Sequence, residues 1–129
     1  MIAVDTNVIA YLLLDGPETG RARELLTRDP EWVAPPLWRS EFRNVLVLYL
    51  RKRELALEDA LVLCAAASSV VSAERDPVEE RVLALAAESG CSAYDAEFVA
   101  VAEELDVPLV TADRALARRF PERVEWLGG

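Results

Sequence analysis

The stretch Met1-Ile-Ala-Val-Asp-Thr-Asn-Val8 decides how the rest of the chain is interpreted. Residues 2–4 form an apolar run without polar alternation, which is typical of a strand buried on both faces of a sheet. The run stops at Asp5, and Thr6 and Asn7 introduce a new apolar pattern of helical spacing. In open α/β sheets, functional sites lie beyond the carboxyl ends of the strands. We therefore expect Asp5 at a functional edge.

The remainder of the chain alternates between short apolar runs and longer segments of helical periodicity. Further strands are predicted at 32–34, 70–72, 108–110 and 124–127. A long helix is predicted at about 37–53 and a second at about 57–68, and together they form a protruding helical pair. This alternation predicts an α/β fold with a parallel sheet and helices on both faces.

Composition narrows the classes of protein and of chemistry. The 129 residues are typical of one domain, and no apolar run reaches the roughly 18 residues of a membrane span. The beginning of the chain is strand-like and lacks the basic region of a signal peptide, so we expect a cytoplasmic protein. The absence of histidine excludes Ser-His-Asp catalysis and imidazole zinc sites. The net charge of -9 argues against passive binding of a polyanion, although not against a nuclease that uses divalent cations.

Two aspartates, Asp5 and Asp113, directly follow predicted buried strands. The alternative interpretation is helix capping, because aspartate is favoured at helix N-termini. For either residue taken alone, capping is the more common role.

Two other acids interrupt apolar helical faces. Glu41 shares a stripe with residues 37, 45, 48 and 49, and Asp95 shares one with residues 98, 99 and 102. Glu41 could instead form a buried salt bridge or lie at the edge of its stripe, and Asp95 could serve the first turn of its helix.

A common explanation for the four acids is a cluster that binds a hard divalent cation. An unpaired carboxylate on a buried face costs several kcal/mol. Mg²⁺ and Mn²⁺ accept oxygen ligands and retain water molecules. Two ions could hold the attacking and leaving oxygens of a phosphoryl displacement, or one ion could activate water with a carboxylate as the base. Spacing alone does not establish that the four acids converge.

Four motifs in this order resemble the PIN-domain family, and most of all the VapC-type toxins of toxin–antitoxin pairs. They are Val-Asp-Thr-Asn-Val at 4–8, Glu41 in its Pro-x4-Glu-x2-Asn context, Ser-Ala-Tyr-Asp-Ala-Glu-Phe-Val-Ala-Val-Ala at 92–102, and Leu-Val-Thr-Ala-Asp at 109–113. The resemblance covers essentially the whole chain. It implies a single PIN-like nuclease domain over 1–129, built as a three-layer α/β/α sandwich around a parallel sheet of four to five strands.

The resemblance also implies an activity and partners. The expected activity is that of an endoribonuclease dependent on Mg²⁺ (or Mn²⁺), which hydrolyses RNA to products with a 5′ phosphate and a 3′ hydroxyl. The expected partners are a small VapB-like antitoxin and a second copy of the chain in a homodimer, which can assemble further with the antitoxin. No membrane partner is implied.

Site roles are carried over from the resemblance by matching positions. The metal-binding and catalytic quartet would be formed by Asp5, Glu41, Asp95 and Asp113. Thr111 would orient a carboxylate or water, and Thr6 and Asn7 would form the turn after the first aspartate. Because arginine suits phosphate recognition, a substrate contact or an ordinary salt bridge is predicted for three residues close to the quartet in sequence, Arg39, Arg43 and Arg114.

Partner contacts are also predicted on the helical pair and on the tryptophans. A groove along the segments 37–49 and 57–71 could hold an antitoxin helix or extended peptide, and the alternative is core packing. The tryptophans Trp32, Trp38 and Trp126 could stack on bases, although packing in the core or an interface is the more common role.

Three other classes of protein are alternatives to the nuclease. A haloacid-dehalogenase-type phosphohydrolase needs a second aspartate where this chain has Asn7, and it needs a catalytic lysine. A response-regulator receiver needs an acidic pair and a lysine, and Lys52 lies at the end of a predicted helix. A non-catalytic acidic PIN-like adaptor remains the alternative, and it would show no metal-dependent RNA hydrolysis.

Overall fold

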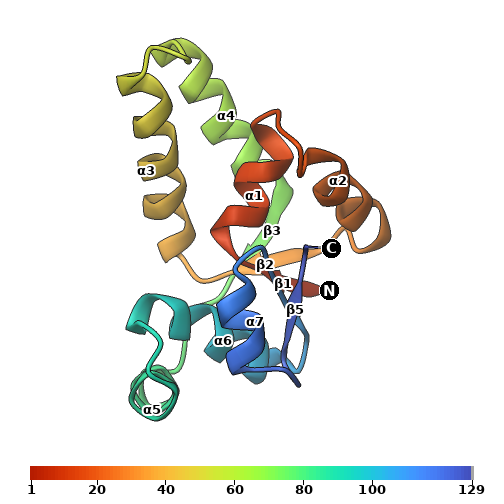
Figure 1. Ribbon diagram of the computed structural model, residues 1–129, viewed down its shortest axis with the longest axis vertical. Coiled ribbons are helices and arrows are strands. Elements are labelled where there is room, and N and C mark those ends of the chain that lie inside the picture. Colours follow the sequence, from red (N-terminus) through yellow and green to blue (C-terminus); the bar gives the residue numbers. More distant parts are fainter. Residues whose placement is uncertain (129) are drawn as a thin grey trace.

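A computed structural model describes residues 1–128 as a five-stranded parallel sheet covered by helices (Figure 1). The strand order is β3-β2-β1-β4-β5. The strands are β1 Ile2–Val4, β2 Trp32–Ala34, β3 Val71–Glu74, β4 Leu109–Thr111 and β5 Val124–Trp126. The helices are α1 Thr6–Leu13, α2 Thr19–Arg28, α3 Leu37–Arg51, α4 Leu57–Val70, α5 Glu79–Ser89, α6 Ala93–Leu105 and α7 Arg114–Arg119.

The central strands are buried because both faces of the sheet are covered. Every residue of β1, β2 and β4 is buried, as their continuous apolar runs predicted. On one face α1 packs against α2, α3 and α4, and on the other α6 packs against β1, β4 and α5. Figure 1 shows these layers, with the α3–α4 hairpin projecting beyond the sheet. The predicted three-layer α/β/α sandwich and the protruding helical pair are thus confirmed.

Strand order places a topological switch point between β1 and β4. The chain proceeds from β1 outward to β2 and β3, and then returns to add β4 and β5 on the opposite side of β1. The pairs Ala3↔Leu109 and Val4↔Val110 keep β1 and β4 in register up to their carboxyl ends. In sheets of this kind, the crevice outside the strands at the switch point is the usual ligand site.

Several predicted boundaries were wrong by a few residues. The helix predicted at 37–53 ends at Arg51, because Arg53 adopts a left-handed φ of 58° that a helix does not accommodate. The helix predicted at 57–68 continues to Val70, and the backbone N–H of Val71 still donates to the Ala67 carbonyl at its end. The strand predicted at 70–72 is therefore Val71–Glu74, and the strand predicted at 124–127 ends at Trp126.

None of the helices over residues 1–128 has both the length and the apolar character needed to cross a bilayer.

Candidate active site

The site begins with Asp5, the first residue after β1. Its side chain is 8% exposed, and one carboxylate oxygen accepts a hydrogen bond of 2.8 Å from the backbone N–H of Thr6. Asp5 is therefore the N-cap of α1, as the capping interpretation predicted. Its other oxygen accepts a hydrogen bond of 2.8 Å from the Thr111 hydroxyl, at the end of β4. Capping thus uses only one of the two oxygens.

Side chains interlock the two turns that follow β1 and β4. The Asn7 side-chain oxygen accepts a hydrogen bond of 3.1 Å from the Ala112 N–H. The Thr111 hydroxyl oxygen accepts a hydrogen bond of 3.0 Å from the Asp113 N–H, while its proton goes to Asp5. These bonds fix the two strand-end aspartates relative to each other through the Thr111 hydroxyl and the Asn7 side chain.

Glu41 reaches the same edge from α3. Its Oε1 accepts a hydrogen bond of 2.7 Å from the Thr6 hydroxyl, so Thr6 donates to Asp5 through its backbone and to Glu41 through its side chain. Glu41 is half-buried and not on the core face of α3, which consists of residues 38, 42 and 46. The predicted stripe through Glu41 is only partly covered, and Leu48 on it is 50% exposed. Glu41 thus lies at the edge of the apolar face, one of the alternatives left open by the sequence.

Asp95 and Asp113 both lie at helix N-termini. Asp95 occupies the first turn of α6, and Ser92 caps that helix by accepting from the Asp95 N–H. Asp113 caps α7, and its Oδ1 accepts hydrogen bonds of 2.9 and 3.2 Å from the N–H groups of Ala115 and Leu116. The capping interpretation therefore holds for Asp113 as well. A helix N-terminus is a favourable place for negative charge in general.

The pKa values of the acids show that three of the quartet are desolvated and that all four interact. Burial, with smaller contributions from the charges of Glu41 and Asp95, raises the pKa of Asp5 from 3.8 to about 6, although Thr111 and Thr6 donate hydrogen bonds to it. Burial and the charge of Asp95 raise the pKa of Glu41. Burial and the charge of Asp113 raise the pKa of Asp95. Each member is thus coupled to at least one other through like-charge repulsion.

Ion pairs of the described residues do not relieve this repulsion. Within residues 1–128, none of the ion pairs involves Asp5, Glu41, Asp95 or Asp113. In the same part of the chain, six arginines pair with other acids: Arg23, Arg28, Arg39, Arg75, Arg81 and Arg123. The cluster is therefore a region of negative charge at the switch point that ion pairs within residues 1–128 do not neutralise.

Sequence reasoning missed two charged residues beside the quartet. Burial and the charge of Glu41 raise the pKa of Glu97, which places a fifth carboxylate at the cluster. The rule that singled out Asp95 would also have found Glu97, since residues 100 and 101 on its helix are apolar. The charge of Arg119 partly lowers the pKa of Asp95, and its guanidinium also donates to the Ser89 carbonyl. No sequence signal pointed to Arg119, which lies 24 residues after Asp95.

The three arginines predicted near substrate phosphate have different surroundings. Arg39 pairs with Glu74 at 2.9 Å and lies over the Trp38 ring, which corresponds to the salt-bridge alternative. Arg43 is exposed on α3, on the side that faces α4. Arg114 directly follows Asp113, and its guanidinium carbon lies 4.8 Å from the centroid of the Trp126 ring. Of these three arginines, Arg114 is the one adjacent in sequence to a residue of the quartet, Asp113.

The donor set fits a hard divalent cation in chemistry, although not as a preformed cage. All donors are carboxylate oxygens, the ligand type that Mg²⁺ and Mn²⁺ prefer. Within residues 1–128, Oε2 of Glu41 and Oδ2 of Asp113 accept no hydrogen bond. In the same part of the chain, no three acidic, cysteine or histidine side chains converge closely enough to enclose an ion. The arrangement suits an ion that keeps water ligands, as Mg²⁺ does.

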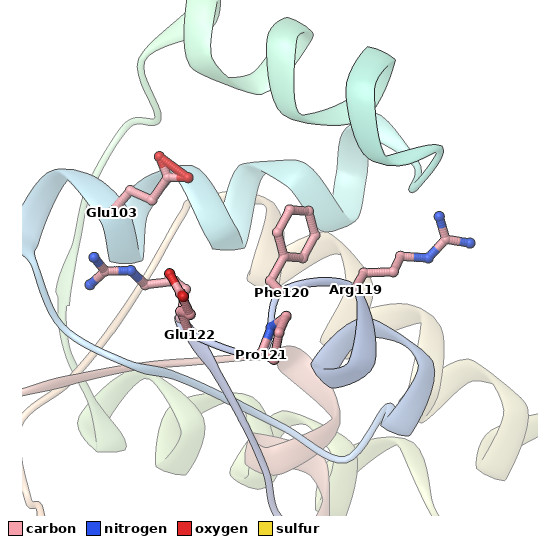
Figure 2. Close-up of a pocket in the computed structure, with 6 residues that line it drawn as sticks. Glu103, Arg119, Phe120, Pro121 and Glu122 are labelled. Carbon is pink, nitrogen blue, oxygen red and sulfur yellow. The ribbon is translucent and has the colours of Figure 1, made fainter.

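A large cavity of about 610 Å³ lies elsewhere, between α6 and the segment after α7 (Figure 2). None of the quartet lines it. Its Glu103 pairs with Arg81, and its Arg123 pairs with Asp106 and donates to the Val107 carbonyl. Figure 2 shows Arg119 extending away from Glu103 and Glu122. Because most of its charges have partners, this cavity lacks the unpaired polar groups that mark a reactive site.

Comparison with known proteins places the chain in a family. The PIN domain model matches residues 2–120, which is most of the sequence. The chain belongs to the PIN domain family. This confirms the resemblance inferred from the four motifs.

Individual relatives agree with this membership. The chain is 29% identical over 127 residues to Ribonuclease VapC3 of Pyrobaculum aerophilum, which covers 95% of this chain and 97% of that protein. The crystal structure of PAE2754 from P. aerophilum superimposes with a TM-score of 0.75 at 24% identity, covering 92% of this chain and 84% of that one. A toxin–antitoxin complex from Klebsiella pneumoniae gives a TM-score of 0.67 at 19% identity, covering 99% and 98%. The two structures support the α/β fold of this PIN domain.

Proposed function

We propose that this PIN domain is a Mg²⁺- or Mn²⁺-dependent endoribonuclease, and the toxin of a toxin–antitoxin pair. The observation that carries the proposal is the group of desolvated, mutually repelling acids at the switch point of the sheet. The likeness to Ribonuclease VapC3 over nearly the whole length of both chains supports RNA as the substrate. Membership of the PIN family supports a nuclease in general.

The residues of the quartet have distinct roles in this proposal. Asp5, Glu41, Asp95 and Asp113 would hold the cation, which supplies positive charge to lower the pKa of water and to stabilise charge on the phosphate. Thr111 and Thr6 keep the Asp5 carboxylate in one orientation by donating to both of its oxygens. A carboxylate with a raised pKa, such as Glu41 or Asp95, is suited to accept a proton from the attacking water.

The Thr6 side chain also positions Glu41, because its hydroxyl donates a hydrogen bond to that carboxylate. The bond of 2.7 Å joins the first turn of α1 to α3. Substrate phosphate would enter where the N-terminus of α1 and the turn at Asn7 offer donors near the acids. Arg114 and Arg119 are the nearby cations that can pair with the phosphates flanking the scissile bond.

The direct test is cleavage of single-stranded and structured RNAs in Mg²⁺ or Mn²⁺, with and without chelator. We expect metal-dependent cleavage that Asp5→Asn abolishes, while circular dichroism of the variant stays native. Asp15→Asn is the matched control, because Asp15 lies in a loop with a side chain that is 97% exposed. If the purified chain cuts no RNA in any metal, the non-catalytic adaptor is the better interpretation. Cleavage that survives Asp5→Asn would remove the quartet from the mechanism.

The antitoxin and the homodimer are assigned to different surfaces. The α3–α4 hairpin exposes several large apolar side chains, at 50% to 67%: Leu48, Leu57, Leu61 and Val62. A groove of about 330 Å³ between α1 and α3 continues from this region to Asn7, at the site. An antitoxin segment docked there would cover the entrance to the acids.

A second apolar surface suits a homodimer. Val78 caps α5, Leu83 lies within α5 and Tyr94 lies in the first turn of α6, and they are 44%, 63% and 62% exposed. Leu83→Glu is expected to shift the mass measured by light scattering from dimer to monomer. Leu61→Glu on the hairpin should leave that mass unchanged and weaken antitoxin binding instead. A monomeric parent protein would contradict the dimer.

A further inference from the structure

Trp126 differs from the other two tryptophans of the chain. Trp32 and Trp38 are 0% and 1% exposed, so they pack in the core and are inaccessible to a base. Trp126 is 38% exposed on the edge strand β5. The sequence-based hypothesis of base stacking is therefore restricted to Trp126.

The Trp126 ring is held against the loop that carries Asp113. Its indole N–H donates a hydrogen bond of 3.3 Å to the carbonyl of Ala112, which lies between Thr111 and Asp113. The backbone of Gly128 packs against the ring so closely that a Cβ there would lie 1.9 Å from ring carbons. The position of the indole is thus fixed relative to the acids.

Arg114 completes an exposed stack. Its guanidinium carbon lies 4.8 Å from the Trp126 centroid, and its side chain is exposed to solvent. A guanidinium over an indole is a favourable cation–π arrangement, and the outer plane of an arginine is itself a stacking surface for a base. Because Arg114 follows Asp113 directly, this surface adjoins the acids.

A groove of about 400 Å³ continues from Trp126 toward α2. Val110, Leu25 and Leu127 contribute apolar side chains to it. Two arginines also line it, and Arg28 is paired with Asp29 and Glu125. Within residues 1–128, no ion pair involves Arg21.

The acids of the groove limit how much polyanion it can accept. Glu24 and Glu125 balance the formal charge of Arg21 and Arg28. The groove therefore suits one nucleotide with one flanking phosphate, and not a long backbone tract.

We propose that Trp126 and Arg114 form a subsite for one nucleotide that flanks the scissile phosphate of a single-stranded RNA. The base stacks on the Trp126–Arg114 pair, and Arg21 contacts the neighbouring phosphate. The inference rests on the proposed nuclease function. It adds a path for the substrate strand, which would pass from the acids to Trp126. Base stacking on aromatic and arginine surfaces is the common way that proteins hold single strands. In a chain of net charge -9, such local contacts are needed to retain RNA.

The test measures binding apart from cleavage. Asp5→Asn protein is titrated in Mn²⁺ with a short mixed-sequence oligoribonucleotide at fixed salt, by fluorescence anisotropy of a label on the RNA. Trp126→Leu in this background is expected to weaken binding roughly tenfold or more, the loss typical of removing one base–aromatic stack. Arg118→Ala, on the same helix as Arg114, is the matched control and should bind like the parent.

A second readout reports the stacking itself. Acrylamide quenches exposed indoles, so in this chain it reports mainly on Trp126, since the other two are buried. Bound RNA should shield Trp126 from acrylamide. An abasic residue can replace each nucleotide of the RNA in turn. At one position, this replacement should weaken RNA binding by the parent protein. At that position it should not weaken binding by Trp126→Leu any further. Gly128→Val keeps the tryptophan at position 126 but displaces its ring, so it should weaken RNA binding as Trp126→Leu does.

The outcomes separate this inference from the proposed function. RNA that binds Trp126→Leu as tightly as the parent, or that leaves acrylamide access unchanged, would overturn the subsite. Binding and shielding as expected, in a wild-type protein that cuts no RNA, would support the subsite and refute the nuclease. If Trp126→Leu fails to fold, two measurements on the parent protein still test the subsite. They are the shielding of Trp126 from acrylamide and the abasic scan of the RNA.

Discussion

Replacing Asp5 by asparagine is expected to stabilise the metal-free protein at neutral pH. In the folded protein, burial raises the pKa of Asp5 from 3.8 to about 6. Each pKa unit corresponds to about 1.36 kcal/mol, so keeping Asp5 ionised opposes folding by about 3 kcal/mol above pH 7. Asparagine has the same shape and carries no charge, so the variant lacks this penalty.

Part of this gain is offset by hydrogen bonding. The Thr111 hydroxyl donates to Asp5 and already accepts from the Asp113 N–H. An asparagine that presents its NH₂ group to Thr111 removes the acceptor for that hydroxyl proton, which costs about 1 kcal/mol. The expected net stabilisation at pH 8 is then about 2 kcal/mol, or about 1 M in the urea midpoint for an m-value of about 2 kcal/mol/M.

The pH dependence follows from the direction of the pKa shift. Because the folded protein binds the Asp5 proton more tightly than the unfolded chain does, the stability from protonation is complete below pH 3.8. It is lost as the pH rises through about 6. Wild type and Asp5→Asn should therefore differ little at pH 4, where the variant is slightly weaker. The variant should become the more stable protein near pH 4.5, and its advantage should grow to about 2 kcal/mol by pH 7.

The assay is urea unfolding at several values between pH 4 and pH 8 in chelator, repeated in Mn²⁺. In Mn²⁺ the wild type should gain stability as the ion binds the folded state, and Asp5→Asn should gain much less. Asp15→Asn should run parallel to wild type at every pH, because its side chain is 97% exposed. A stability difference that stays constant from pH 4 to pH 8, or a variant weaker at pH 8 in chelator, would refute the desolvation of Asp5.

Three further substitutions test other parts of the structure. Glu97→Gln should raise metal-free stability at pH 8 by less than Asp5→Asn, because Glu97 is less buried, and equal stability in a urea titration would place it outside the cluster. Thr111→Val should destabilise the fold by about 2 kcal/mol, because it leaves buried polar groups unpaired. It should also lower metal-dependent cleavage, and an unaltered kcat would contradict the role of Thr111 in orienting Asp5. Phe98→Ala, at 1% exposure, should cost about 3–5 kcal/mol in thermal unfolding, and a smaller loss would indicate that α6 packs loosely.

The sequence predicted the sheet because its signals are local. Buried parallel strands are continuous apolar runs, and those at 2–4 and 32–34 were located with the correct bounds. Helix ends were less accurate because they depend on single backbone conformations, such as the positive φ at Arg53.

The site was predicted less completely, because its contacts are between distant segments. The acids at strand ends were evident, since an abrupt stop after an apolar run is a local signal. The hydrogen bond from Thr6 to Glu41 spans 35 positions, and that from Thr111 to Asp5 spans 106. Sequence periodicity also placed Glu41 on a core stripe, whereas the core face of α3 is the neighbouring one. Position along a helix defines a face, but only packing decides which face is buried.

The largest difference between the two regions is in how their charged side chains are paired. Around the cavity of about 610 Å³, Glu103 and Arg123 have partners, as a surface shaped for stability alone would arrange them. At the switch point the opposite holds, because the acids repel one another and none of the ion pairs within residues 1–128 involves the quartet. Backbone and hydroxyl donors orient these acids without neutralising them, so their repulsion persists in the absence of metal. Such an arrangement makes physical sense when a cation completes it, and metal-dependent stability is therefore a more direct test of this site than any search for a preformed pocket.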